Sequence, residues 1–232
     1  DELQPQAVIF SDGGPGCRWV GNEHGFAGAT NWSFLRAGEV YPGYPKYREL
    51  QYGHADGNQW VAAECDVSIR PGWFYHPEED DRVKTVDELT DLYYRSVGHN
   101  ATLLLNFPVD RDGLIHPTDS ANAVNFHQNV QKQLAHNLLA GLSPKASDER
   151  GRTFSAKAVT DGDYDTYWAT NDDVISATIE FDLPQAEKIN RMMLQEYIPL
   201  GQRVKSFVVE YNQAGEWIPV KFNEETTTIG YK

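Results

Sequence analysis

The chain of 232 residues carries a formal net charge of −14 at pH 7 and has a sequence pI near 4.8. An acidic protein repels polyanions, so this charge argues against nucleic acids and anionic membrane surfaces as partners. No run of the sequence approaches the roughly 18 consecutive apolar residues of a membrane-spanning helix. The length is sufficient for one large domain or two modest ones.

The first distinctive stretch, 7–32, opens on an apolar run at 7–10 that is bounded by Pro5 and by a Gly-Gly-Pro cluster. Apolar residues followed directly by glycine and proline are typical of a strand that ends in a loop. We therefore expect a strand at 7–11 that is buried on both faces, as in a parallel sheet.

The loop after this strand gathers polar and aromatic side chains within seven positions: Arg18, Trp19, Asn22, Glu23 and His24. Sugar hydroxyls require planar hydrogen-bonding groups, and the C–H face of a pyranose packs on an aromatic ring. The aromatic content of 12% is higher than a core usually demands. The loop therefore indicates a sugar site. The alternative is that Trp19 is a core residue and that Arg18 and Glu23 form a solvated surface pair.

Strand and helix patterns alternate as far as residue 141. The expected elements are a loop-rich segment to about 58, a strand at 60–65, a helix at 86–97, a strand at 101–106 and a helix at 118–139. Thr85 is the expected N-cap of the first helix, and Glu88 is its capping-box partner. This alternation predicts βα units built around a parallel sheet.

The pattern changes from Ser143 onward, where turn residues separate short apolar segments that show no helical period. The expected strands lie at 176–182, 189–196, 205–211 and 216–221. This spacing is typical of an antiparallel β-sandwich. The sequence therefore predicts an α/β part over 1–141 and a β-sandwich over 142–232.

Polar residues follow the predicted parallel strands at their carboxyl ends, where such sheets place their sites. Asp12, Glu64 with Asp66, and Asn106 with Asp110 fall at or just beyond these ends. We expect these residues to line one pocket, with only one of Glu64 and Asp66 facing it.

Three further residues are pocket candidates. Trp73 follows a Pro-Gly turn that could fix an exposed indole, although a core tryptophan beneath a loop fits the pattern equally well. His54 and His76 could bind substrate, but a lone histidine is more often only hydrogen-bonded within the protein.

Three motifs, in this order, carry a resemblance to a known family: IFSDGGPGCRWVGNEHG, WVAAECDVSIRPGWFYHPEED and NATLLLNFPVDRDGLI. They resemble the second half of the catalytic (β/α)8 barrel of family 29 α-L-fucosidases, and most closely the subgroup that acts on α1,3/α1,4-linked fucose. The tail AVTDGDYDTYWATNDDVISATIEFDL is similar to the discoidin-like F5/8 type C module that often follows this barrel. The resemblance covers nearly the whole chain.

This resemblance implies a retaining exo-α-L-fucosidase that uses two carboxylates about 5 to 5.5 Å apart. Glu23 matches the family's general acid/base, and Glu64 is a second choice for that role. The family's nucleophilic aspartate lies in a Trp-Phe-Asp-Gly motif upstream, and this chain contains no such motif. Asp12 is the nearest substitute, but a structural role for it in the turn at 13–14 is the stronger expectation.

The expected substrate-binding residues are Trp19, Arg18, His24, His54, Glu64 and Trp73. The expected partners are a fucosylated glycan and a second chain or missing segment that completes the barrel. The alternative is a non-catalytic sugar-binding protein that keeps the pocket but lacks one carboxylate.

We expect neither a metal nor a cofactor. The acidic run at 77–81 predicts a solvated loop, because its carboxylates lack spaced partners. The spacing of Asp161, Asp163, Asp165 and Thr166 fits either a calcium loop or Asx turns, and we favour the turns. Cys17 and Cys65 do not decide the redox compartment, and we expect a periplasmic or secreted protein.

Overall fold

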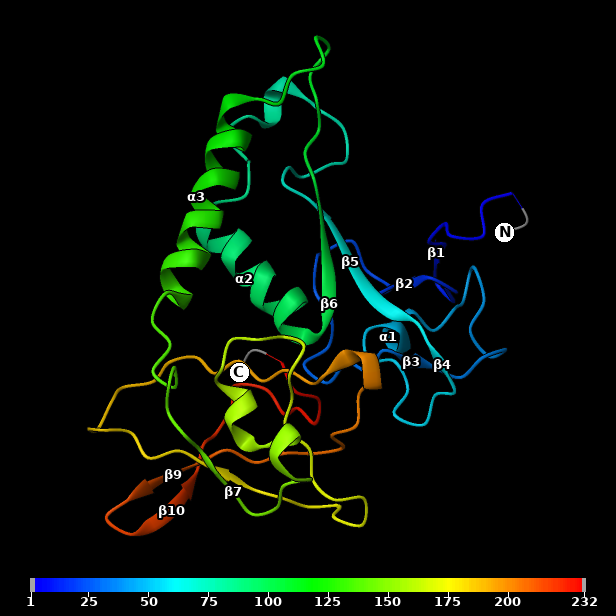
Figure 1. Cartoon of the computed structure of the whole chain (residues 1–232). Coiled ribbons are helices and arrows are strands. Elements are labelled where there is room, and N and C mark those ends of the chain that lie inside the picture. The colour runs from blue at the N-terminus through cyan, green and yellow to red at the C-terminus, as the bar shows by residue number, and fades with distance from the viewer. Residues whose placement is uncertain (1–2, 231–232) are drawn as a thin grey trace. The chain divides into compact units, whose positions relative to one another are not determined.

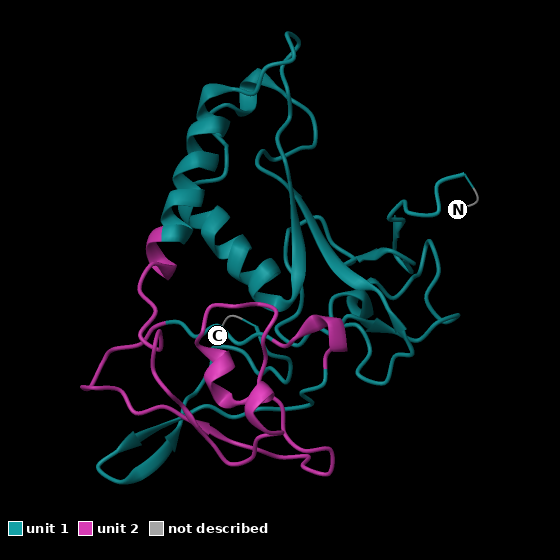
Figure 2. Cartoon of the chain, in the orientation of Figure 1, with its two compact units in different colours: residues 1–131, 191–195, 203–232 teal, residues 132–190, 196–202 magenta. Residues whose placement is uncertain are grey.

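The computed structural model describes residues 3–230, which are drawn in Figure 1. The chain divides into two compact units (Figure 2). Unit 1 comprises residues 1–131, 191–195 and 203–232, and unit 2 comprises residues 132–190 and 196–202.

The centre of unit 1 is a parallel sheet with strand order β1-β2-β5-β6. Its strands are β1 (Phe10–Ser11), β2 (Cys17–Trp19), β5 (Ala62–Ser68) and β6 (Ala101–Asn106), and each pairs in parallel with its neighbour. The predicted parallel sheet is therefore confirmed. In the described residues it is an open sheet with β1 and β6 at its edges, and these residues do not close it into a barrel. A separate antiparallel pair joins β3 (Phe34–Leu35) to β4 (Gln59–Trp60).

Three helices belong to this part of the chain: α1 (Tyr47–Leu50), α2 (Val86–Ser96) and α3 (Pro117–Leu134). The predicted capping box is present, because Glu88 N donates to Thr85 Oγ1 and Thr85 N donates to Glu88 Oε2. Two short 3₁₀ turns flank α2: η1 (Pro77–Glu79) lies before it and η2 (Val97–His99) follows it directly. The predicted helix at 118–139 ends earlier, at Leu134, because residues 137–142 form turns in which N–H groups bond to carbonyls three positions back.

The core of unit 1 lies between one face of the sheet and the helices. Val67 of β5 and Ile69, which follows this strand, pack with Leu89 and Leu92 of α2, and Phe126 of α3 adds to this cluster. Figure 1 shows α2 and α3 alongside β6. Residues of β5 alternate between buried and partly exposed positions, so the opposite face of the strand carries the side chains that can reach solvent.

The predicted strand at 7–11 is correct in place but wrong in burial. Only Phe10–Ser11 pairs, and Phe10 is 47% exposed while Val8 is 74% exposed. The physical reason is the position of β1, which lies at the edge of the sheet and pairs with β2 alone in the described residues.

Unit 2 contains one antiparallel pair, β7 (Lys145–Ala146) with β8 (Ile179–Glu180). The 3₁₀ turns η3 (Arg152–Phe154), η4 (Ala156–Val159) and η5 (Ile198–Leu200) complete its regular structure. Aromatic rings hold the unit together: Tyr167 stacks on Tyr197 with centroids 4.3 Å apart and contacts Phe154 at 5.0 Å. Trp168 donates its indole N–H to Asp148 O at 2.9 Å.

The C-terminal part of the chain returns to unit 1. The hairpin of β9 (Glu210–Gln213) and β10 (Glu216–Pro219) lies in this segment. Thr226 Oγ1 donates to Ala29 O at 2.7 Å, and Asn31 N donates to Thr228 Oγ1 at 2.9 Å. Of the four strands predicted after residue 143, the described residues contain only short antiparallel pieces at 179–180, 210–213 and 216–219. None of the helices described over residues 3–230 is long and apolar enough to cross a membrane.

Candidate active site

Glu23 lies in a tight loop after β2 whose shape depends on glycine at both ends. Gly21 and Gly25 have φ angles of +75° and +79°, which residues with a Cβ rarely adopt. A Cβ at Gly21 would clash with the carbonyl oxygen of Tyr47, and one at Gly25 would lie 2.7 Å from Val67 Cγ1. Asn22 ties the loop internally, because Nδ2 donates to Phe26 O at 3.0 Å and Oδ1 accepts from the His24 amide at 2.9 Å. The sequence therefore presents Glu23 on a short and constrained support.

The carboxylate of Glu23 is bound by the indole of Trp73. Trp73 Nε1 donates to Glu23 Oε2 at 2.8 Å, although the two residues are 50 positions apart in sequence. The loop after β5 thus meets the loop after β2, as expected where parallel strands end at the same edge of a sheet. The structure brings together these two predicted site residues.

Trp19 and Asp66 form a second indole–carboxylate pair. Trp19 Nε1 donates to Asp66 Oδ1 at 2.7 Å, and the Trp19 ring makes an edge contact with Tyr47 at a centroid distance of 5.6 Å. Glu64 lies beside Trp19 in the register of β2 and β5, and its Oε2 is 4.0 Å from Cys17 Sγ. Trp19 is partly exposed, and its indole N–H has a carboxylate partner, so it is not a core residue.

Our expectation that only one of Glu64 and Asp66 faces the pocket is wrong. Residues two apart in a strand project to the same side, and both are partly exposed while Cys65 between them is fully buried. The face of the sheet opposite the helices therefore carries two carboxyl groups.

These carboxyl groups share a partly desolvated environment. Burial raises the pKa of Asp66, the negative charge of Glu23 raises it further, and the hydrogen bond from Trp19 opposes the change. Burial, together with the charge of Asp66, also raises the pKa of Glu64. The raised pKa values of Asp66 and Glu64 mark this face of the sheet as a candidate site for acid–base chemistry.

Asn106, at the end of β6, supports the Trp73 loop. Its Nδ2 donates to Trp73 O at 3.0 Å and to Ser68 Oγ at 3.1 Å. Asn106 is among the residues that we expect to line the pocket. Ser68 was missed by the sequence analysis, because its only signal is its place at the end of β5. Asp110 lies in a turn instead, where Oδ1 accepts from the amides of Asp112 and Leu114.

Arg18 occupies the opposite face of β2 and is a core residue with 0% exposure. Its guanidinium donates to Leu50 O at 3.0 Å, to Val61 O at 2.7 Å and to Asn31 Oδ1 at 2.5 Å. Burial lowers the pKa of Arg18 to about 10. Because its donors are used inside the protein, Arg18 does not contact substrate as we expected. The alternative of a surface pair with Glu23 is wrong as well, because Arg18 is buried.

The predicted histidines are dispersed. His54 is 8% exposed, accepts from the Arg36 amide through Nδ1 at 3.2 Å and lies 3.8 Å from Glu49 Oε2. Burial and then the charge of Arg36 lower the pKa of His54. These contacts are with the β3 segment and α1, so His54 is structural here rather than part of the Glu23 cluster.

His24 and His76 lie in exposed positions. The His24 ring stacks on Phe26 with centroids 6.2 Å apart, next to Glu23 in the same loop. The carbonyl of His76 accepts from Arg70 Nη1 at 3.4 Å. Of these two histidines, only His24 lies in the Glu23 loop.

Asp12 serves the loop at 43–44. Its Oδ2 accepts from Gly43 N at 2.6 Å and from Tyr44 N at 3.3 Å. A structural role was expected, but in the turn at 13–14, where Ser11 Oγ accepts from Gly13 N instead. The carboxylate of Asp12 is therefore engaged in backbone capping.

The acidic segments form ion pairs and turns. Asp80 of the run at 77–81 lies 2.9 Å from Arg70 Nη1, so this run is more than a solvated loop. In the tail, Asp161 Oδ1 accepts from Asp163 N and Asp163 Oδ1 accepts from Asp165 N, each at 2.9 Å. These are the hydrogen bonds of Asx turns. Across residues 3–230, no three His, Cys, Asp or Glu side chains are grouped so as to hold a metal ion.

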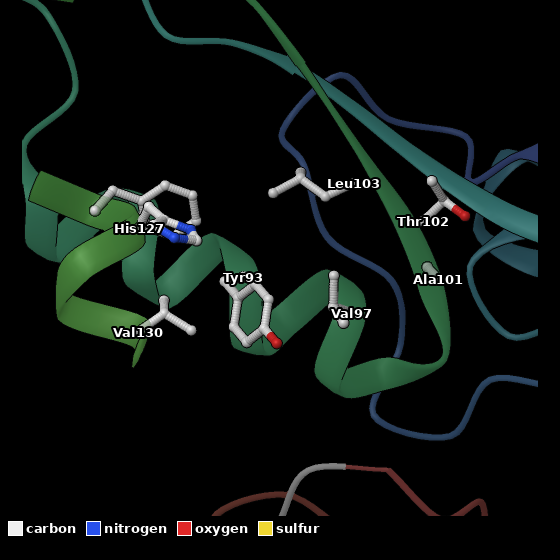
Figure 3. A pocket seen from close by; sticks show the side chains of 8 residues that line it. Tyr93, Val97, Ala101, Thr102, Leu103, His127 and Val130 are labelled. Atoms are coloured by element: carbon white, nitrogen blue, oxygen red, sulfur yellow. The ribbon is translucent and has the colours of Figure 1, made fainter. Parts of the chain in front are cut away.

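A cavity of about 510 Å³ lies in unit 1 away from these carboxylates, between α2, α3 and the edge strand β6 (Figure 3). Its lining is mostly apolar: Tyr93, Val97, Ala101, Thr102, Leu103, Phe126, His127 and Val130. No carboxylate lines it, so it lacks the groups for glycoside hydrolysis by a pair of carboxylates.

Comparison with known proteins gives matches over the whole chain. Residues 143–231 match the F5/8 type C domain, a β-sandwich module. The chain is 41% identical over 237 residues to a protein of Oryza sativa subsp. japonica whose name assigns it provisionally as alpha-L-fucosidase 1; the match covers 100% of this chain and 44% of that protein. It is 37% identical over 241 residues to Alpha-L-fucosidase 1 of Arabidopsis thaliana, covering 100% of this chain and 46% of that protein.

A solved structure gives the same result. A GH29 fucosidase of Ruminococcus gnavus in complex with fucose superposes with a TM-score of 0.85 at 32% identity, over 97% of this chain and 46% of that chain. The relatives of this chain are thus α-L-fucosidases, and the chain spans about half the length of the relatives it matches.

Proposed function

We propose that this chain forms the second half of the catalytic barrel of a retaining exo-α-L-fucosidase that acts on fucosylated glycans, with Glu23 as general acid/base. The observation that carries the proposal is the hydrogen bond from Trp73 to Glu23 at 2.8 Å, beside the pair of Trp19 and Asp66. The similarity to α-L-fucosidases along the whole chain supports the substrate class.

The reaction requires Glu23 to give a proton to the departing glycan oxygen and later to take one from water. Glu23 is exposed enough to reach a substrate, and the indole of Trp73 fixes one of its oxygens. The indoles of Trp19 and Trp73 offer apolar surfaces against which the C–H face of a sugar can pack.

A retaining mechanism also requires a nucleophilic carboxylate about 5 to 5.5 Å from Glu23. Asp12 is occupied by the amides of Gly43 and Tyr44, so it is a poor candidate. We assign the nucleophile to the part of the relatives' length that this chain does not span.

That additional part would dock against the edge of the sheet at β6. The strand is an edge in the described residues, Leu104 is 44% exposed, and the cavity of Figure 3 adjoins it with a mostly apolar lining. An unpaired apolar edge is a liability that proteins normally cover. Hydrogen exchange of the full-length polypeptide tests this docking. The alternate amides of residues 101–106 that point away from β5 are expected to exchange slowly, and exchange of these amides as fast as in exposed loops would contradict the docking.

The finer assignments are part of the same proposal. The substrate linkage is α1,3 or α1,4. Residues 1–141 belong to the barrel, and residues 142–232 form the discoidin-like module. The protein is periplasmic or secreted. Comparison of fucose release from α1,2-, α1,3- and α1,4-linked oligosaccharides tests the linkage; preference for the α1,2 isomer would contradict the assignment.

The activity is tested by incubating the full-length polypeptide with a fucosylated oligosaccharide and following the product by NMR. Release of fucose first as the α anomer is expected, because two inversions at the anomeric carbon retain its configuration. Initial release of the β anomer would contradict retention. Fucose binding without release would indicate the alternative of a non-catalytic sugar-binding protein.

A further inference from the structure

Two hydrogen bonds connect the end of β6 to the carboxylate of Glu23. Asn106 Nδ2 donates to the carbonyl oxygen of Trp73 at 3.0 Å, and Trp73 Nε1 donates to Glu23 Oε2 at 2.8 Å. The two contacts use opposite parts of Trp73, its backbone and its side chain. A residue of a strand is thereby linked to a loop side chain more than 80 positions away in sequence.

We propose that Asn106 is a positioning residue that sets the place of the Glu23 carboxylate through Trp73. This inference rests on the proposed role of Glu23 as acid/base. Asn106 is suited to the task because it lies at the end of a regular strand, in register with Ser68 of β5. Side chains on strands are held more exactly in place than those on loops.

The chemistry at this position requires an amide. Asn106 donates to two acceptors, the Trp73 carbonyl and the Ser68 hydroxyl. A carboxylate of the same shape cannot donate and would repel the carbonyl oxygen. Replacement of Asn106 by Asp is therefore a near-isosteric change that removes the support of Trp73.

The remaining anchors of the segment 71–79, which carries Trp73, centre on Arg70, whose guanidinium donates to His76 O at 3.4 Å and lies 4.6 Å from the centroid of the Tyr75 ring. Arg70, before the loop, is 1% exposed and makes a bidentate pair with Asp119 at 2.8 and 2.9 Å. The same guanidinium reaches Asp80, beyond the loop, at 2.9 Å. These contacts hold the residues on either side of Trp73, whereas the bond from Asn106 holds Trp73 itself, so loss of that bond is expected to shift the indole without unfolding the loop.

The first test is kinetic and uses the full-length polypeptide. Since a displacement of about 1 Å can cost roughly 100-fold in rate, we expect Asn106→Asp to lower kcat/KM for a fucosylated oligosaccharide by about 10- to 100-fold. An activated aryl fucoside needs little protonation of its leaving group, so it loses only what depends on packing of the sugar against Trp73 and should fall clearly less than the oligosaccharide. Asn122→Asp is the matched control, because Asn122 Nδ2 likewise donates to a backbone carbonyl, that of Lys84, at 2.9 Å. It should affect neither substrate.

A double-mutant cycle with Trp73→Phe tests whether Asn106 acts through Trp73. If it does, Asn106→Asp should cost little in the Trp73→Phe background, because the indole N–H is already absent. Additive losses would overturn the proposal. Equal losses of Asn106→Asp on both substrate classes would overturn it as well, because they would indicate a merely structural role.

The second test does not depend on activity. The indole N–H resonance of Trp73, assigned from its absence in Trp73→Phe, should shift on Glu23→Gln and on Asn106→Ala but not on Asn122→Asp. An unchanged resonance in Asn106→Ala would overturn the proposal even if the enzyme were inactive. If instead Glu23→Gln leaves oligosaccharide hydrolysis intact, the proposed function fails, and the resonance still decides whether Asn106 positions Trp73.

Discussion

Trp19 of β2 donates its indole N–H to Asp66 of β5 at 2.7 Å, on the face of the sheet that the helices leave open. The carboxyl group is partly buried, so its ionised form is disfavoured despite this hydrogen bond, and its pKa is raised. Asp66 therefore lowers the stability of the fold when it is charged, a cost that proteins tolerate at functional sites.

Asp66→Asn should make the protein as stable as or more stable than the wild type at pH 7. The folded-state pKa of Asp66 lies above the ordinary 3.8, so the wild type loses stability as pH rises from 3.8 through the raised pKa. The variant lacks this loss, because asparagine is neutral and Oδ1 can still accept from Trp19. Denaturant unfolding at pH 7 and below pH 4 measures the difference, which should shrink at the lower pH. A variant less stable than the wild type at pH 7 would contradict the account.

Arg18→Met should destabilise the protein by about 3 kcal/mol or more, because buried acceptors lose their charged donor. The three acceptors are Leu50 O, Val61 O and Asn31 Oδ1. The matched control is Arg36→Met, since Arg36 pairs with Asp56 on the surface and its side chain is 43% exposed. A surface pair contributes at most about 1 kcal/mol. Equal free energies of unfolding for the two variants would show that Arg18 is not a structural residue.

Gly21→Ala should destabilise the Glu23 loop more than Gly38→Ala destabilises its own loop. Both glycines have positive φ, so both substitutions carry a backbone cost of about 1 kcal/mol. Only the Cβ at position 21 meets another backbone, at Tyr47, whereas nothing lies within 4 Å of a Cβ at position 38. Thermal unfolding and kcat/KM for an oligosaccharide measure the two effects. The prediction fails if Gly38→Ala is equally harmful to both.

Local signals in the sequence were sufficient for the elements that depend on neighbours along the chain. The capping box of Thr85 and Glu88 and the strand Ala101–Asn106 appear as predicted. In contrast, β2 escaped prediction because it has only three residues, and its central residue, Arg18, is a charge that is buried. Burial of an arginine depends on acceptors 13 to 43 positions away, which no local pattern reveals.

The candidate site shows the same limit. Motif resemblance indicated Glu23, Trp19 and Trp73, but the partners of their polar groups depend on strand register. The pair of Trp19 and Asp66 is separated by 47 positions, and that of Glu23 and Trp73 by 50. The return of the segment around Thr228 to Asn31, 197 positions away, likewise has no local signal.

The most direct measurement of the central claim is kcat/KM of Glu23→Gln in the full-length polypeptide on two substrates, an oligosaccharide and an activated aryl fucoside. This parameter reports the bond-cleavage step, where only the oligosaccharide requires a proton from Glu23. The account predicts that kcat/KM falls by about 10² to 10⁴ on the oligosaccharide and changes only a few-fold on the aryl fucoside. Glu64→Gln should not show this contrast between the two substrates. For Glu23→Gln, equal losses on both substrates, or undiminished oligosaccharide hydrolysis, would contradict the account.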